Sequence, residues 1–360
     1  GKLNLNRLKE SIQKTIHRHE SLRTVFQTVG EEIVQVVPSE NETETIYFGH
    51  KTFPKDTFSE NAENFIHEEW NRKFDLEKGP LFYTHLVSFR DDTHLLTFTM
   101  HHIVADETAK DLIGESLSEF YNDIADKENI PSLQMGDFAV WERNQDMSKI
   151  TRSQGAWWLA RLEGAPLELE LPTDYQRTTE LQFVGDRVKA NFSTQQSKLL
   201  KKVVQSSDAT PFMGFQAAWA LFLGKLCNTK DVVIGAPVSL RNKAGLEKTL
   251  GFLINSLPFR ITYTEELSFS DLLATTRKDT LAAYKNVDIP FEEIVSLLDP
   301  NRTSSTSPIF QVMLVMNGKP SAAPHLEGIE SEIITTNPKS AKFDLTLFVS
   351  ETEEGIELML

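Results

Sequence analysis

This chain of 360 residues contains a single cysteine, Cys227, and lacks any long apolar run. One cysteine excludes an internal disulfide and a thiolate metal cluster, and it favours a reducing compartment, so we expect a cytoplasmic protein. The longest apolar runs fall short of 18 residues, which predicts no membrane span. The phosphate-loop, dinucleotide-binding and Gly-x-Ser-x-Gly fingerprints are missing too, which leaves those nucleotide-binding and serine hydrolase classes without support.

Positive charge is also scarce. The 37 lysines and arginines are outnumbered by 52 aspartates and glutamates, which gives a formal net charge of −15 and an isoelectric point near 5.1. This balance argues against nucleic acid or an anionic membrane surface as the main partner. The hydrophobic content of 40% and the charged content of 25% are ordinary for a globular protein, and the length is sufficient for two domains with separate cores.

Helix-like and strand-like patterns alternate in both halves, which predicts a mixed α/β (α+β) fold with two lobes. We place the N-terminal lobe at residues 1–165 and the C-terminal lobe at residues 166–360, because residues 164–166 and 171–174 are typical of a linker. Both ends of the chain fall within helix-like or strand-like patterns, so we expect a piece excised from a larger polypeptide. Helices are predicted over residues 8–16, 59–73, 106–124, 154–163, 212–226 and 269–285, and strands around residues 25–37, 80–89, 94–102, 232–234, 309–316, 343–349 and 355–360.

The most informative stretch is residues 94–107, where a strand pattern runs into His101 and His102 and Asp106 follows. Side chains alternate between the two faces of a strand, so His102 shares a face with the apolar Met100 and is predicted to point inward. An imidazole tuned by burial and by its neighbours suits proton transfer near neutral pH. We therefore predict that His102 is catalytic; a satisfied histidine at a strand end is the alternative.

Asp106 stands just past the strand pattern, where a helix pattern begins, so its carboxylate can also cap that helix. A metal site is the other chemistry that paired histidines suggest. However, adjacent histidines on a strand point in opposite directions, the helical spacing of two histidines four apart is absent, and cysteine ligands are lacking. We therefore expect no metal at His101 and His102.

Two later positions are further candidates. Arg241 follows the rigid Gly235-Ala236-Pro237 turn, and its planar guanidinium is suited to pairing with a buried carboxylate. Asn255 is a polar amide among apolar neighbours at a predicted strand start. Residues 18–24, Arg-His-Glu-Ser-Leu-Arg-Thr, place charges at a helix end, which by itself is typical of a capped and solvated terminus.

The chain resembles a condensation domain of a nonribosomal peptide synthetase, within the chloramphenicol-acetyltransferase-like superfamily. Six ordered motifs carry the resemblance, and together they cover nearly the whole chain. Their order and spacing are far more specific than the short His-His-x-x-x-Asp motif alone. The motifs are residues 18–24, 101–106, 136–143, 234–255, 288–292 and 307–312.

The resemblance implies two chloramphenicol-acetyltransferase-like lobes in a V-shaped pseudodimer, with an active-site tunnel between them. In that family an acceptor amine attacks a donor thioester and forms an amide bond. By position in the motif, His102 would be the catalytic histidine, which positions the amine, accepts its proton or stabilises the tetrahedral intermediate. His101 would be structural, and Asp106 would pair with Arg241 across the site. Asn255 is a weaker candidate in a tunnel-lining motif.

The resemblance also implies the partners. Both substrates would be carried on the 4′-phosphopantetheine arms of the upstream and downstream peptidyl carrier proteins, and an adenylation domain would be adjacent. No tightly bound cofactor, no metal, no nucleic acid and no membrane are expected.

One position departs from the family pattern. Glycine normally follows the aspartate, and here that position is Glu107, which adds volume and charge near the supposed acceptor path. Glu107 keeps open the alternative of a non-catalytic, condensation-like docking domain. An ester-forming relative and an acyltransferase that uses coenzyme A are further alternatives. The helix-end motif resembles the subtype that accepts an L-configured upstream residue.

Overall fold

The computed structural model describes residues 1–39, 47–53, 58–90, 92–124, 131–178, 183–298, 306–318, 321–334, 336 and 339–360. The chain forms two compact units, each assembled from segments that are distant in the sequence. Unit 1 comprises Gly1–Gln145, Leu240–Leu253 and Ser321–Thr336, and unit 2 comprises Asp146–Ser239, Ile254–Pro320 and Asn337–Leu360. The two predicted lobes follow the sequence order and meet at residue 165. In the structure, Leu240–Leu253 and Ser321–Thr336 belong to unit 1, and residues 146–165 belong to unit 2.

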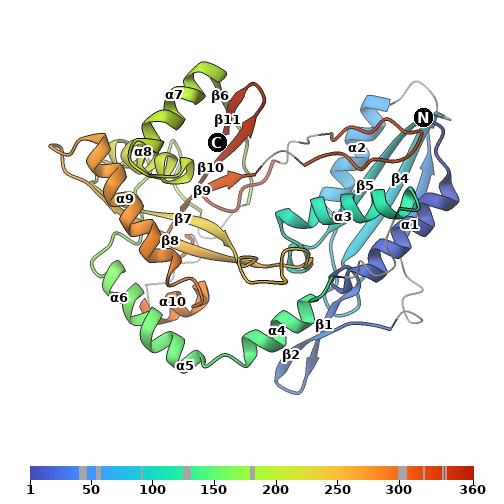
Figure 1. The fold of residues 1–360 in the computed structure, drawn as a ribbon, viewed down its shortest axis with the longest axis horizontal. Coiled ribbons are helices and arrows are strands. Elements are labelled where there is room, and N and C mark those ends of the chain that lie inside the picture. Colours follow the sequence, from blue (N-terminus) through green and yellow to red (C-terminus); the bar gives the residue numbers. More distant parts are fainter. Residues whose placement is uncertain are drawn as a thin grey trace. The chain divides into compact units, whose positions relative to one another are not determined.

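Unit 1 is built on a sheet of three strands and on a separate two-stranded hairpin (Figure 1). In the sheet, β3 pairs in parallel with β4, and β4 pairs antiparallel with β5. The strands are β1 (Val25–Val29), β2 (Glu32–Val36), β3 (Tyr47–Thr52), β4 (Phe82–Arg90) and β5 (Thr93–Met100), and the helices are α1 (Leu5–Arg18), η1 (Glu20–Arg23), α2 (Phe58–Trp70), η2 (His102–Val104), α3 (Glu107–Tyr121) and α4 (Met135–Arg143).

The alternation of β4 explains how this sheet is covered. Phe82 and Leu86 face one side, where they pack with the apolar stripes of α1 and α3, and Val87 and Phe89 face the other side, where α2 supplies Phe65. The stripe of α1 is its helical repeat of apolar residues, the one predicted over residues 8–16. Because both faces are covered, the end of β5 is held firmly where it passes into the turn that carries the histidines.

Unit 2 contains a mixed sheet of six strands in the order β6-β11-β10-β9-β7-β8 (Figure 1). Its β7 strand is buried over Val232–Ala236, because helix α8 packs against it and Phe310 covers Gly235 so closely that a Cβ would lie 2.1 Å from the ring. The strands are β6 (Lys189–Ser193), β7 (Asp231–Ser239), β8 (Ile254–Thr262), β9 (Val312–Asn317), β10 (Leu345–Thr352) and β11 (Gly355–Met359). The helices are α5 (Met147–Ile150), η3 (Thr151–Gly155), α6 (Ala156–Leu162), α7 (Thr194–Gln205), α8 (Pro211–Leu226), α9 (Phe269–Tyr284) and α10 (Phe291–Leu298).

The mixed α/β architecture agrees with the prediction, and each predicted helix corresponds to an observed one. Two differences stand out. The predicted strand over residues 94–102 ends at Met100, and strand β6 with helix α7 was not predicted at all. Within the described part of the chain, every helix is too short or too polar to span a bilayer. No group of three or more His, Cys, Asp or Glu side chains in that same part is arranged to hold a metal ion.

Candidate active site

The His-His-x-x-x-Asp motif forms the turn between strand β5 and helix α3, entirely within unit 1. The backbone N–H of His101 donates to the carbonyl oxygen of Leu81 at 3.0 Å, which makes one further bond between the ends of the two strands. The chain then turns through the 3₁₀ helix η2 and reaches Asp106, the N-cap of α3.

His101 has a structural role in this turn. Its Nδ1 accepts a hydrogen bond from the backbone N–H of Ile103 at 3.1 Å, and its ring packs edge-on against Phe74 with the centroids 5.5 Å apart. Because Nδ1 accepts, a neutral His101 carries its proton on Nε2. The side chain thus caps the 3₁₀ helix.

His102 is an exposed residue, which corrects the prediction that it points inward. The prediction extended the strand alternation through residue 102, whereas β5 ends at Met100 and η2 turns the backbone. The His102 Nδ1 lies 2.5 Å from the carbonyl oxygen of Ala105. A carbonyl only accepts, so Nδ1 carries the proton, and a neutral ring keeps its lone pair on Nε2. The arrangement therefore leaves Nε2 as the proton acceptor.

Asp106 is fully buried, and both of its carboxylate oxygens are used. Oδ1 accepts from the backbone N–H of Thr108 at 3.1 Å, which caps helix α3. Oδ2 accepts from Arg241 Nη1 at 2.6 Å and from the backbone N–H of Leu253 at 3.0 Å. The side chains of Asp106 and Arg241 are 0% and 8% exposed, so the predicted ion pair is present and is shielded from solvent.

Arg241 also donates hydrogen bonds to the backbone of its own segment. Its Nε and Nη2 donate to the carbonyl oxygen of Thr249 at 3.2 and 3.0 Å, and Nη2 also donates to that of Gly251 at 3.2 Å. Asp106 falls in the first predicted lobe and Arg241 in the second. Both partners instead lie in unit 1, because Leu240–Leu253 packs with that unit although it follows β7 in the chain. The ion pair therefore anchors the segment Leu240–Leu253 beside the His102 turn.

Glu107 is the first residue of α3, and its exposed carboxylate forms an ion pair with Lys110 one turn later in the same helix. A carboxylate at the first turn of a helix is favoured by the helix dipole. These contacts are those of a residue that starts a helix.

Asn255 lies in unit 2 and is buried. Its Nδ2 donates to the carbonyl oxygens of Val287 and Ile289, both at 2.8 Å, and its Oδ1 accepts from the backbone N–H groups of Ser256 and Phe291 at 2.8 and 3.2 Å. All four hydrogen-bonding positions of the amide are thus filled by the backbone. Asn255 therefore holds the 288–292 motif in place. The family resemblance had marked it only as a weaker candidate in a tunnel-lining motif.

The helix-end motif at residues 18–24 is a buried polar cluster and not the solvated terminus that its composition suggested. Arg18 donates to Glu119 at 2.5 Å and to Ser116 at 3.2 Å, and Ser116 lies 2.9 Å from His19 Nε2. Burial, and secondarily the Arg18 charge, lower the pKa of His19 to about 4. The imidazole is therefore neutral at physiological pH, and the motif ties α1 to α3.

Sequence reasoning missed Phe252 as a neighbour of His102. The two rings meet edge to face, with centroids 5.2 Å apart and planes at 88°. An apolar residue in an apolar stretch gives no signal of such a contact, because the contact depends on where the segment Leu240–Leu253 packs.

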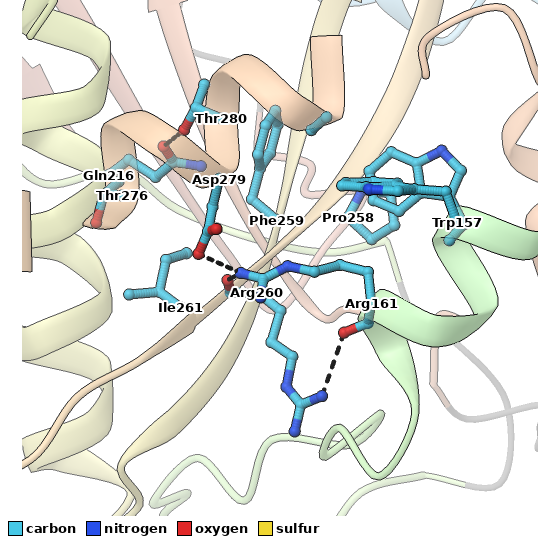
Figure 2. Close-up of a pocket in the computed structure, with 12 residues that line it drawn as sticks. Trp157, Arg161, Gln216, Pro258, Phe259, Arg260, Ile261, Thr276, Asp279 and Thr280 are labelled. Atoms are coloured by element: carbon cyan, nitrogen blue, oxygen red, sulfur yellow. Dashed lines mark hydrogen bonds and ion pairs between the residues drawn. The ribbon is translucent and has the colours of Figure 1, made fainter. Parts of the chain in front are cut away.

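Unit 2 has a separate, narrow pocket that is lined by none of the predicted site residues (Figure 2). Arg161 crosses it and donates to Asp279 at 2.6 Å, and Gln216 accepts from Thr280 at 2.7 Å. These polar groups pair with one another across the pocket, which gives them a structural role. The other lining residues are Trp157, Trp158, Pro258, Phe259, Arg260, Ile261, Thr276 and Ala283.

Comparison with known sequences identifies relatives along the whole chain. The Condensation domain family model matches residues 1–360. Surfactin synthase subunit 1 of Bacillus subtilis (strain 168) is 31% identical over 362 residues, which cover 100% of this chain and 10% of that protein. Gramicidin S synthase 2 of Brevibacillus brevis is 33% identical over 362 residues, which cover 100% of this chain and 8% of that protein. The chain thus spans a tenth or less of the length of these two relatives.

Solved structures share the fold. The X-domain from teicoplanin biosynthesis superposes with a TM-score of 0.87 at 24% identity, over 100% of this chain and 82% of that one. The first condensation domain of the calcium-dependent antibiotic synthetase superposes with a TM-score of 0.76 at 18% identity, again over 100% and 82% of the two chains.

Proposed function

The chain belongs to the condensation domain family, and from this premise we propose that it is an acyltransferase that forms an amide bond between two carrier-bound thioesters. The donor is an aminoacyl or peptidyl thioester and the acceptor an aminoacyl thioester. Both are held on the 4′-phosphopantetheine arms of carrier proteins, one upstream and one downstream, and an adenylation domain is adjacent. The prediction of a cytoplasmic location, based on the single cysteine, is part of the same proposal.

The observation that carries the proposal is the hydrogen bond between His102 Nδ1 and the carbonyl oxygen of Ala105. With Nδ1–H donating to Ala105, the free lone pair on Nε2 belongs to an exposed imidazole. During the reaction the acceptor nitrogen attacks the thioester carbon, and the C–N bond forms. Nε2 of His102 accepts the proton that the nitrogen loses, the C–S bond breaks, and the proton passes to the departing thiolate.

The neighbouring residues support this chemistry without taking part in it. His101 caps the turn that carries His102, and the Asp106–Arg241 ion pair holds the turn and the segment Leu240–Leu253 together. Glu107 is paired with Lys110, so we assign it to the helix start and not to acceptor selection. We assign Asn255 to the support of the 288–292 motif.

The test is single-turnover transfer between two loaded carrier proteins, with the product identified by mass spectrometry. We expect an amide-linked product with the wild-type domain and a large loss with His102→Ala. Binding of carriers without any product would instead favour a docking domain. Product only from a hydroxyl-bearing acceptor would favour the ester-forming relative, and product only from a coenzyme A donor would favour the free acyltransferase. Each of these outcomes contradicts the proposal.

A further inference from the structure

Phe252 is the aromatic neighbour of His102, and it reaches that place from a distant part of the chain. Its ring meets the imidazole edge to face at a centroid distance of 5.2 Å, and the residue is 41% exposed. The ring is partly buried, and its aromatic partner among the described residues is His102.

The residues on either side of Phe252 are fixed by the Asp106–Arg241 ion pair. The carbonyl oxygen of Gly251 accepts from Arg241 Nη2 at 3.2 Å, and the N–H of Leu253 donates to Asp106 Oδ2 at 3.0 Å. The side chain of Leu253 is fully buried in an apolar cluster with Phe138 and Leu246. With its backbone held on both sides, residue 252 has its Cβ direction fixed towards the His102 turn.

Among the residues that the structure describes, His102 has one hydrogen bond, and this bond does not by itself fix the plane of the ring. The bond from Nδ1 to the Ala105 carbonyl fixes one atom, yet the ring is exposed and can turn about its side-chain bonds. A second contact from the side is needed to fix the ring plane, and Phe252 supplies it. An edge-to-face aromatic pair prefers one relative orientation of the two rings.

We propose that Phe252 is a positioning residue that holds the His102 imidazole in the orientation with Nδ1–H bonded to Ala105 and Nε2 free. The buried ion pair of Asp106 and Arg241 acts on His102 through the backbone of Gly251 and Leu253 and then through the Phe252 ring. This inference rests on the proposed function for its catalytic consequence, whereas the orientation of the ring can be measured without any reaction.

The first measurement is the tautomer ratio of His102, read from long-range ¹H–¹⁵N spectra of histidine-labelled protein and assigned with His102→Asn. In Phe252→Ala the ratio of the Nδ1–H to the Nε2–H form should fall by roughly two- to tenfold, the range that corresponds to one edge-to-face pair. Phe252→Tyr keeps the ring and should keep the ratio. Phe269→Ala removes a phenylalanine of similar exposure, 39%, at the start of α9 and should also leave it unchanged. An unchanged ratio in Phe252→Ala would overturn the proposal.

The second measurement is single-turnover transfer between loaded carriers. Phe252→Ala should be slower by roughly two- to tenfold, with Phe252→Tyr close to the wild type. If the wild-type domain forms no amide, the proposed function fails while the tautomer ratio still decides the role of Phe252. If the ratio changes and the rate does not, the positioning role in catalysis is rejected. A thermal melt of each variant confirms that the fold is retained.

Discussion

At the scale of single residues, the two adjacent histidines differ in which ring nitrogen carries the proton. His101 accepts at Nδ1 and His102 donates from Nδ1, so only His102 combines exposure with a free Nε2. The difference comes from the backbone, because His101 precedes the 3₁₀ turn and His102 begins it. Neighbouring residues of the same type therefore have different chemistry.

Replacing each histidine should separate these roles. His102→Ala should lower the single-turnover rate by roughly 10²–10⁴-fold, the usual contribution of a general base, with an unchanged melting temperature. His101→Ala should mainly lower the melting temperature, because it removes the cap on Ile103 and the contact with Phe74. A folded His102→Ala domain with full activity would reject the catalytic assignment.

His19 predicts how stability depends on pH. Its folded pKa is about 4 and its ordinary value is 6.5, so between these pH values the unfolded chain binds a proton that the folded chain does not. The free energy of unfolding should therefore fall by about 3 kcal/mol as the pH is lowered from 6.5 to about 4. In urea unfolding, the free energy of unfolding of His19→Gln should fall less over this pH range than that of the wild type. His67→Gln, at an exposed position on α2, should behave like the wild type.

Glu107 offers a prediction about substrate selection. Glu107→Gly should lower stability by about 0.5–1 kcal/mol, because glycine is a poor helix residue and the carboxylate at the helix start is lost. The set of acceptors used should not change, because the carboxylate is exposed and already paired with Lys110. The comparison uses several carrier-loaded acceptors with one fixed donor. A broader acceptor range in Glu107→Gly would show that this position lines the acceptor path.

At the scale of elements, the segment Leu240–Leu253 belongs to unit 1 and is attached to it through a buried ion pair. The Asp106–Arg241 pair, the bonds of Arg241 to Thr249 and Gly251, and the buried Leu253 side chain attach this segment to the turn before α3. Its neighbours β7 and β8 belong to unit 2. Within unit 1, the segment is thus attached to the turn before α3 by a buried charge pair.

Breaking this pair should therefore be costly. Arg241→Ala leaves the Asp106 carboxylate buried without its counter-charge, and we expect a loss of roughly 3–5 kcal/mol in urea unfolding. Asp106→Ala should cost about as much, and the double variant should lose clearly less than the sum of the two single losses. Lys110→Ala, which breaks an exposed pair, should change stability by less than about 1 kcal/mol. Additive losses would show that the two side chains are not coupled.

At the scale of the whole molecule, each unit combines segments that are far apart in the sequence. Unit 1 takes two segments from the second half of the chain, and the six-stranded sheet of unit 2 places β6 beside β11. The predicted lobes follow the sequence order with a single boundary at residue 165, whereas each unit combines segments from both halves of the chain. Local composition shows where a linker is plausible, whereas the packing partner of a segment depends on contacts across more than a hundred residues.

The mixed α/β class, most helices and the order of the six motifs could be predicted from the residues themselves, whereas the ion pair of Asp106 with Arg241 was implied by the family resemblance. These follow from periodicities over a few residues and from the chemistry of side chains named by their motifs. The structure was needed to show that β5 ends at Met100 and exposes His102, that Asn255 supports the 288–292 motif, and that Phe252 packs against the imidazole. The physical reason is distance along the chain. Asp106 and Arg241 are separated by 135 residues, and the packing that brings residues 240–253 to the His102 turn leaves no local pattern.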